Sequence, residues 1–186
     1  VVDRNVPKKK IDRIKSKLKG KENYFYFIRA SEKNKNQNNV NKILEILLRR
    51  NFSRQDCLIT IGGGITGDLG GYAASLFKRG LQFINLPTTL LSQVDSSIGG
   101  KTGINTKYGK NLVGTFYQPK LVISDTSFLS SLPKKQMICG YAEILKHSII
   151  KDLNFFNWLK KNTKEILNKN SDKLIFAIKK SCLIKM

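Results

Sequence analysis

The sequence is poor in acidic residues, cysteine and histidine. It has 13 Asp and Glu against 34 Lys and Arg, three cysteines, and a single histidine, His147. Cys57, Cys139 and Cys182 are odd in number and have no framework spacing, which favours a reduced, cytoplasmic setting over a disulfide-stabilised one. No apolar run approaches the roughly 20 residues of a membrane span, and no signal peptide is recognisable. We therefore expect no membrane association.

The shortage of acidic residues leaves a formal net charge of +21. A positive charge of this size is a common feature of proteins that bind nucleic acid. The lysines, however, are spread among asparagines and isoleucines, and no zinc-finger or RNA-recognition motif is present. The sequence therefore favours compositional drift over nucleic-acid binding. A basic nucleotide- or nucleic-acid-binding module without catalysis stays as an alternative function.

The first motif follows an apolar run at residues 57–61, which predicts a strand. Gly62 to Gly67 (GGGITG) has the spacing of a dinucleotide-binding turn that leads into a helix. Glycines let the backbone approach a pyrophosphate, and the helix N-terminus offers N–H groups to the anion. The acidic residue expected about 20 positions later to bind a ribose is missing, and Asp68 follows the turn instead. We therefore predict a dinucleotide site that departs from the standard arrangement.

A second motif is a glycine-rich segment with few strand signals, which we predict to be a loop. It contains Lys101, Asn105, Lys110 and Asn111. The triplet GKT around Lys101 resembles the end of a Walker A loop, but Asp95 replaces the first glycine of that motif and would repel a phosphate. An NTPase site is therefore excluded. The lysines are either solvated loop charges or part of an anion-binding loop.

Hydrophobic periodicity and turn residues predict the elements of the chain. Helices are predicted over residues 8–19, 40–50 and 67–78, and strands over residues 24–28, 57–61, 83–86 and 120–124. Residues 31–39 are predicted as a loop. Pro87 begins a further helix, where Thr88 and Thr89 either cap the helix or contact a cofactor. Lys78 and Arg79 are expected in a last helical turn, capped by Gly80.

The order of these elements predicts the fold class. Strands and helices alternate after residue 57, which is typical of a parallel sheet covered by helices. Ser131-Leu132-Pro133 is a strong helix start, and all that follows is predicted to be helical. The sequence thus predicts an α/β fold with a Rossmann-like parallel-sheet domain over residues 1–130, followed by the start of an all-helical domain over residues 131–186.

Four segments together resemble the 3-dehydroquinate synthases of the sugar-phosphate cyclase superfamily: GGGITGD, LPTTLLSQVDSSIGGKTGIN, GKNLVGTFYQP and GYAEILKH. The resemblance runs from about Glu32 to Lys146. It implies a lyase of the shikimate pathway, which leads to chorismate and the aromatic amino acids. With NAD and a divalent metal, Zn²⁺ or Co²⁺, such an enzyme eliminates phosphate from 3-deoxy-arabino-heptulosonate 7-phosphate and cyclises it to 3-dehydroquinate. Another cyclase of the superfamily and an inactive truncated NAD-binding remnant are the alternatives.

The resemblance also assigns roles to single residues, and implies that the domain over residues 1–130 binds NAD. Catalytic or substrate-binding roles fall on Lys35, Arg79, Asp95, Lys101, Lys110, Asn111 and Lys146. Cofactor-binding roles fall on Glu32, Lys35, Gly63, Gly64, Asp68, Thr88, Thr89, Leu91, Asp95, Ser96, Lys101, Lys110, Phe128, Leu129, Ser130 and Ser131. Without the resemblance, Asp68 and Asp95 could equally be helix caps, Glu32 and Lys35 solvated surface charges, and Arg79 a helix-end cation.

A metal site is the last expectation. Glu143 and His147 stand four residues apart, so both lie on one face of a helix, although His147 alone is expected to be a partly exposed helix residue. The resemblance makes Glu143 a zinc ligand beside two histidines further downstream, which this sequence does not contain. Catalytic zinc usually takes three protein ligands. We therefore expect a truncated product or a fragment, or else a degraded copy, of an enzyme that is a homodimer when complete. Whether 186 residues suffice for turnover stays open.

Overall fold

The computed structural model describes residues 1–186 and contains a parallel sheet of five strands. Their order is β2-β1-β3-β4-β7, and every neighbouring pair is parallel. The strands are β1 (Val2–Asp3), β2 (Phe27–Ile28), β3 (Cys57–Gly62), β4 (Gln82–Pro87) and β7 (Leu121–Val122). From β1 the chain first adds β2 on one side and then β3 and β4 on the other. The strand order therefore reverses between β1 and β3, where open α/β sheets bind their ligands.

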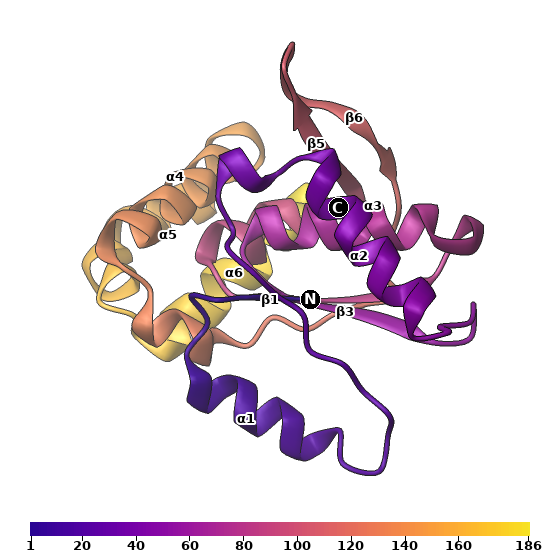
Figure 1. Cartoon of the computed structure of the whole chain (residues 1–186). Helices are drawn as coiled ribbons and strands as arrows, with labels where there is room; N and C mark the ends of the chain where they lie inside the picture. The colour runs from indigo at the N-terminus through magenta and orange to yellow at the C-terminus, as the bar shows by residue number, and fades with distance from the viewer.

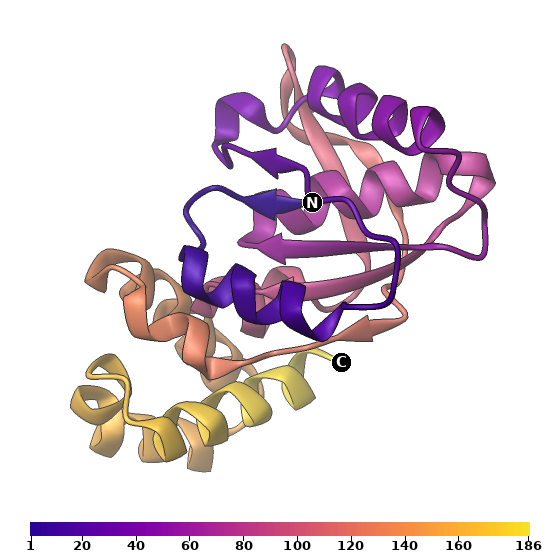
Figure 2. The same cartoon turned by 60° about the horizontal axis from the view of Figure 1, so that its bottom comes forward.

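Helices cover both faces of this sheet (Figures 1 and 2). On one face, α2 (Gln37–Arg49) and α3 (Gly64–Leu76) share a hydrophobic core with β3, β4 and Ile104. On the other face, α1 (Lys8–Lys17) packs through Ile11 against Ile61, Leu86 and Phe128. Helix α3 lies very close to the sheet, since a Cβ atom added at Gly70 would stand 2.1 Å from Thr60 Cγ2. The α/β prediction is confirmed.

A two-stranded antiparallel hairpin packs against α3 and projects beyond it (Figure 1). It consists of β5 (Lys101–Thr106) and β6 (Gly109–Phe116). The prediction of a strand-poor loop here is wrong. Its glycines are pairing positions instead: Gly103 faces Gly114, and a Cβ atom at Gly114 would lie 2.0 Å from the backbone oxygen of Thr102. Glycine thus marks a close approach of two strands at this point.

The last third of the chain is helical, as predicted. It holds α4 (Lys134–Lys151), α5 (Leu153–Leu167) and α6 (Ser171–Lys185), which pack against one another beside the sheet (the helical layer; Figure 2). Their core also includes Leu90, which lies between β4 and the π-helix η3 (Ser92–Ser96), and Val94 of η3. The helical layer is therefore anchored on the segment that follows β4. No helix of the structure is both long and apolar enough to cross a membrane.

Several element predictions need correction. β2 covers two residues instead of five, and Tyr24 and Phe27 are 38 % and 37 % exposed. Residues 31–39 are not a plain loop, since they include the 3₁₀ turn η1 (Glu32–Asn34) and the start of α2. Lys78 and Arg79 follow α3 in the turn η2 (Phe77–Arg79), with φ of 46° and 64°. Left-handed backbone cannot continue an α-helix, so they lie outside its last turn.

Candidate active site at the carboxyl edge of the sheet

A cavity of about 590 Å³ opens beside α3, between the hairpin and η3. It lies near the carboxyl ends of the central strands, as expected for an open α/β sheet. Three lysines and two carboxylates give it a strongly polar lining. The lining residues are Lys35, Asp68, Asp95, Ser96, Ile98, Lys101, Thr102, Gly103, Asn111, Leu112, Gly114, Thr115, Phe116 and Lys185.

Lys35 is the most buried charge of the cavity. Only 7 % of its side chain is exposed, and its ammonium group pairs with Asp68 of α3 and donates a hydrogen bond to Asn111 Oδ1 of β6. Burial raises the pKa of the Asp68 carboxyl above its usual value, and the hydrogen bond from Lys35 offsets part of that rise. Segments that are far apart in sequence thus meet at one buried ion pair. This arrangement excludes the interpretation of Lys35 as a solvated surface charge.

The glycine turn lies at the end of β3, next to the cavity. Gly63 is the N-cap residue of α3, and no side chain caps that helix. A Cβ atom at Gly63 would lie 3.2 Å from Thr89 Cγ2, and one at Gly64 would lie 2.8 Å from Ser96 Oγ. The turn is therefore packed against the chain after β4. Thr66 and Gly67 donate their backbone N–H groups to the Gly63 oxygen, so the N–H groups before them, at the start of α3, are those that can meet an anion. This geometry can hold a pyrophosphate at the N-terminus of α3.

Three possible metal ligands lie at the base of the helical layer. The ligand atoms of Asp95, Glu143 and His147 all fall within 4.8 Å of one another. Glu143 Oε1 is buried, pairs with the Lys146 ammonium group and stands 3.3 Å from His147 Nε2. Two ligands of one tetrahedral zinc, each about 2.1 Å from the ion, are separated by roughly 3.4 Å. Two carboxylates and an imidazole within 4.8 Å of one another form a donor set that fits a divalent metal.

The histidine differs from its predicted environment. His147 is 6 % exposed, and its Nδ1 lies 2.7 Å from Ser181 Oγ of α6. Burial lowers the pKa of His147 below its usual value, so the ring is neutral at neutral pH. A neutral ring is the form that can bind a metal. The expectation of a partly exposed helix residue is wrong, because α6 covers this face of α4.

Two further lysines lie beside this cluster. Lys185, near the end of α6, pairs with the Asp95 carboxylate and donates to the Asp95 backbone oxygen at 2.8 Å. Lys146 pairs with Glu143 and keeps 56 % of its side chain exposed. Sequence reasoning missed Lys185, which stands in no motif. Only its helical spacing of four from Ser181 places it on the face that covers His147.

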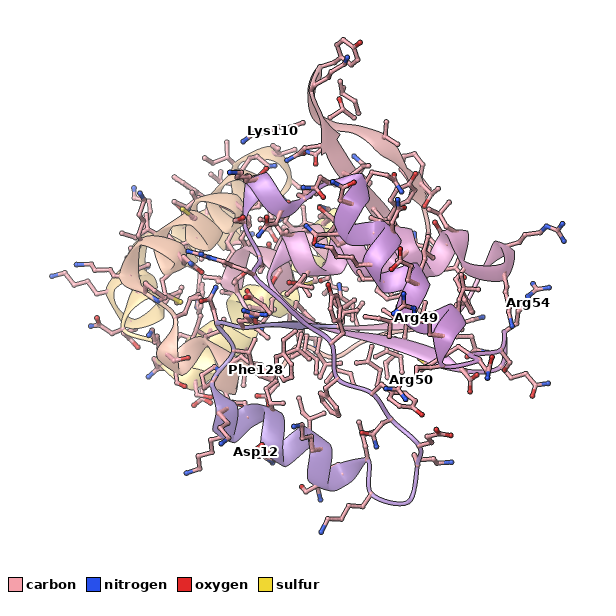
Figure 3. The ribbon with its side chains drawn as sticks, viewed as in Figure 1. Asp12, Arg49, Arg50, Arg54, Lys110 and Phe128 are labelled. Carbon is pink, nitrogen blue, oxygen red and sulfur yellow. The ribbon has the colours of Figure 1, made fainter.

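Other predicted site residues lie at the margin of the cavity or away from it. Lys110 projects into solvent (Figure 3), 71 % exposed and 3.7 Å from Glu32 Oε2. Phe128 packs between α1 and the sheet, and Leu129 belongs to the core of the helical layer. These positions do not line the cavity, and their cofactor roles stay predictions. The same holds for the cofactor roles of Thr88, Thr89, Leu91, Ser130 and Ser131 and for the substrate-binding role of Arg79.

Comparison with known proteins gives the family. The model of the 3-dehydroquinate synthase N-terminal domain matches residues 25–139, and the model of the C-terminal domain matches residues 140–186. The chain belongs to the 3-dehydroquinate synthase family. The resemblance seen in the sequence is thereby confirmed. The two models meet between residues 139 and 140, and the boundary at residues 130/131 stays a prediction.

Curated relatives of the chain carry the family name. A 3-dehydroquinate synthase of Pelagibacter ubique is 63 % identical over 186 residues, which is 100 % of this chain and 50 % of that protein. A 3-dehydroquinate synthase of Bartonella tribocorum is 44 % identical, over 100 % of this chain and 49 % of that protein. The chain therefore spans about half the length of the curated relatives it matches.

Solved structures confirm the fold. A 2-epi-5-epi-valiolone synthase of Streptomyces hygroscopicus, with NAD⁺ and Zn²⁺ bound, has a TM-score of 0.91 at 27 % identity and covers 98 % of this chain and 52 % of its own. A 2-deoxy-scyllo-inosose synthase, complexed with carbaglucose-6-phosphate, NAD⁺ and Co²⁺, has a TM-score of 0.71 at 32 % identity. The match covers 78 % of this chain and 41 % of that protein. Both are similar to this chain in fold.

Proposed function

We propose that this chain supplies the NAD- and substrate-binding half of a 3-dehydroquinate synthase. The reaction is phosphate elimination from 3-deoxy-arabino-heptulosonate 7-phosphate and cyclisation to 3-dehydroquinate, a step of the shikimate pathway. The observation that carries the proposal is the cavity itself, which brings Lys35, Lys101 and Lys185 together with Asp68 and Asp95 beside the glycine turn. The 63 % identity to a curated 3-dehydroquinate synthase favours this reaction over those of the other cyclases, at 27 % and 32 %.

The residues of the cavity suit an anionic sugar phosphate. A substrate with a carboxylate and a phosphate needs several cations around it, and lysine ammonium groups supply them as point charges. Asn111 and Thr102 add groups that can bind hydroxyls. NAD, when bound, would supply reversible hydride transfer, with its pyrophosphate at Gly63 and Gly64. The role of the chain is then to hold the nicotinamide and the sugar ring at fixed positions inside the cavity.

Glu143, Asp95 and His147 are the residues of this chain that would hold a divalent metal. When bound, a metal such as Zn²⁺ or Co²⁺ would polarise a substrate hydroxyl as a Lewis acid. The family resemblance names Glu143 alone, and Asp95 and His147 are the two further donors within reach. We further propose that the complete enzyme is a cytoplasmic homodimer, in which Arg79 contacts the substrate of the neighbouring subunit. The position of Arg79 outside the cavity of its own chain agrees with this.

A chimera tests the proposed function. Residues 1–186 would replace the matching half of the Pelagibacter ubique relative, with which they align over their full length. We expect the chimera to release phosphate from 3-deoxy-arabino-heptulosonate 7-phosphate in the presence of NAD and zinc. A folded chimera that binds NAD but releases no phosphate from this substrate would favour another cyclase reaction or an inactive remnant.

The Glu143→Gln variant tests the metal ligand. The change is nearly isosteric and removes the negative charge, so zinc affinity should fall by at least about a hundredfold in the chimera, because a neutral amide is a poor ligand for a dication. The control is Glu165→Gln on α5, which changes the same charge outside the cluster. Zinc affinity is measured by competition with a chromophoric chelator. Equal affinities of the Glu143 variant and the parent would remove Glu143 from the site.

The Lys110→Ala variant separates ligand binding from stability. Lys110 is 71 % exposed, so its loss should change the free energy of unfolding by less than about 0.5 kcal/mol. An exposed charge contact contributes up to about 1 kcal/mol, so NAD affinity should fall by up to about fivefold. Denaturant unfolding and calorimetric NAD titration check the two quantities. Lys107→Ala, in the turn of the same hairpin, should change neither, and a matching loss of stability and affinity at position 110 would make Lys110 structural.

A further inference from the structure

Asn105 stands at an irregularity of the hairpin. Ile104 of β5 pairs with Val113 of β6, and Thr106 pairs with Gly109, with a register shift between the two pairs. One residue of β5, Asn105, is thus opposite three residues of β6, residues 110–112. A bulge of this kind frees backbone groups from the ladder and redirects side chains, and such bulges are frequent beside active sites.

The polar groups of Asn105 replace the missing ladder bonds. Its Oδ1 accepts a hydrogen bond from the Asn111 backbone N–H at 3.0 Å. Its Nδ2 donates to the Glu32 side-chain Oε2 at 2.8 Å and to the Glu32 backbone oxygen at 3.2 Å. Its own backbone N–H donates to the Lys35 backbone oxygen at 2.7 Å. Asn105 therefore joins the bulge of β6 to the segment that carries Glu32 and Lys35.

Both ends of this connection reach the cavity. Asn111 has φ of 58°, a left-handed conformation that asparagine tolerates better than most residues. In this conformation its N–H meets Asn105, while its side-chain oxygen accepts the hydrogen bond from the Lys35 ammonium group. The ion pair between Lys35 and Asp68 completes the connection to α3.

We propose that Asn105 is a positioning residue that fixes Asn111 and Lys35 relative to each other and thereby sets the affinity of the cavity for NAD. The proposal rests on the proposed function for its ligand. The hydrogen bonds around Asn105 are independent of the proposed function, because they can be measured without any ligand. Asn105 does not line the cavity itself, so it acts through Asn111 and Lys35.

The chemistry of the position explains why an asparagine suits it. The side chain must accept a hydrogen bond from a backbone N–H and donate one to a carboxylate, and the amide does both at once. An aspartate would keep the acceptor but place a second carboxylate against that of Glu32. The resulting repulsion should push the Glu32 and Lys35 segment away from the bulge.

A double-mutant cycle tests whether the Asn105 side chain must donate a hydrogen bond to Glu32. NAD is titrated calorimetrically into the 186-residue chain and into Asn105→Asp, Glu32→Gln and the double variant. We expect Asn105→Asp to weaken NAD affinity about tenfold in the parent, but less than about threefold in the Glu32→Gln background. In that background the amide introduced at position 32 can donate to the new carboxylate. Asn157→Asp, the same change at an exposed position of α5, should have no effect.

A second readout needs no ligand. In ¹⁵N-labelled chain, the Asn111 amide should exchange its hydrogen at least about tenfold faster in Asn105→Ala than in the parent, because its acceptor is lost. If the Asn105→Ala variant fails to fold, the double-mutant cycle of Asn105→Asp and Glu32→Gln tests the positioning role by itself. Equal effects of Asn105→Asp in both backgrounds, or unchanged Asn111 exchange in a folded alanine variant, would overturn the positioning role. A parent chain that binds no NAD but shows the exchange effect would overturn both the proposed function and the effect of Asn105 on NAD affinity, and would leave only the hydrogen bond between Asn105 and Asn111.

Discussion

Replacing Lys35 by methionine should destabilise the protein and weaken its binding of NAD. The methionine fills a similar volume but leaves Asp68, with 17 % of its side chain exposed, without a cationic partner. Breaking a buried pair from one side costs about 3–5 kcal/mol, and the partial exposure of Asp68 puts the expected loss at about 2–3 kcal/mol. NAD affinity should fall about ten- to a hundredfold, since a hydrogen bond from a charged group is lost in the cavity.

The pH dependence of this loss follows from the Asp68 pKa. Burial raises that pKa in the folded protein, and the hydrogen bond and charge of Lys35 lower it. A raised carboxyl pKa means that the folded state binds a proton more tightly than the unfolded chain, so stability falls as pH rises through the folded pKa. Removing Lys35 raises the pKa further. The variant should therefore lose most stability at neutral pH and less in mild acid, where Asp68 is protonated.

Urea unfolding at several pH values measures this effect. Lys33→Met, two residues earlier on an exposed position, is the matched control and should change stability by less than about 0.5 kcal/mol. Adding Asp68→Asn to Lys35→Met should restore much of the lost stability, because no charge is then left unpaired. A loss in Lys35→Met that does not depend on pH would show that packing, and not the ion pair, is responsible.

Replacing Gly140 by alanine should have the second large effect. Gly140 is the point where α4 meets the chain after β4, and a Cβ atom there would lie 2.6 Å from Leu90 Cβ and from the Leu91 backbone nitrogen. Alanine is the better helix former by about 1 kcal/mol, which alone would stabilise α4. The clash involves backbone as well as side chain, so it should outweigh this gain and lower the free energy of unfolding by about 2–3 kcal/mol.

The control for this change lies one residue away. Cys139 is exposed on the same helix, and Cys139→Ala should stay within about 0.5 kcal/mol of the parent. Urea unfolding of both variants, followed by tryptophan fluorescence, gives the comparison, because Trp158 lies beside the core of the helical layer. A Gly140→Ala variant as stable as the parent would contradict a close contact between α4 and the chain at Leu90 and Leu91.

The elements whose signals lie within a few residues of one another could be predicted from the sequence. Residues 57–67 combine an apolar run with a glycine turn, and both features act within a few residues, so β3 and the start of α3 could be predicted. The helical end of the chain could be predicted from the helix start at Ser131-Leu132-Pro133, whereas its division into α4, α5 and α6 could not. The glycine content predicts a loop where the hairpin lies, because the close approach of two strands at Gly103 and Gly114 depends on strand pairing, which has no local signal.

The site could be predicted only where a motif names its residues. Lys35, Asp68, Asp95 and Lys101 were predicted and the fold gathers them in one cavity. Lys185 and the burial of His147 depend on how α6 packs against α4, which no short motif encodes. The link from Asn105 to Glu32 joins residues 73 positions apart, so it too appears only in three dimensions.

The most direct test of the account is an NAD titration of the ¹⁵N-labelled 186-residue chain, followed by its amide chemical shifts. The account predicts saturable shifts at the glycine turn and the cavity, namely at Gly63, Gly64, Asp68, Lys35 and Asn111, and none on the outer face of α5. Titration without any shift, or saturable shifts that avoid the turn and the cavity, would contradict the claim that this edge of the sheet is the cofactor site.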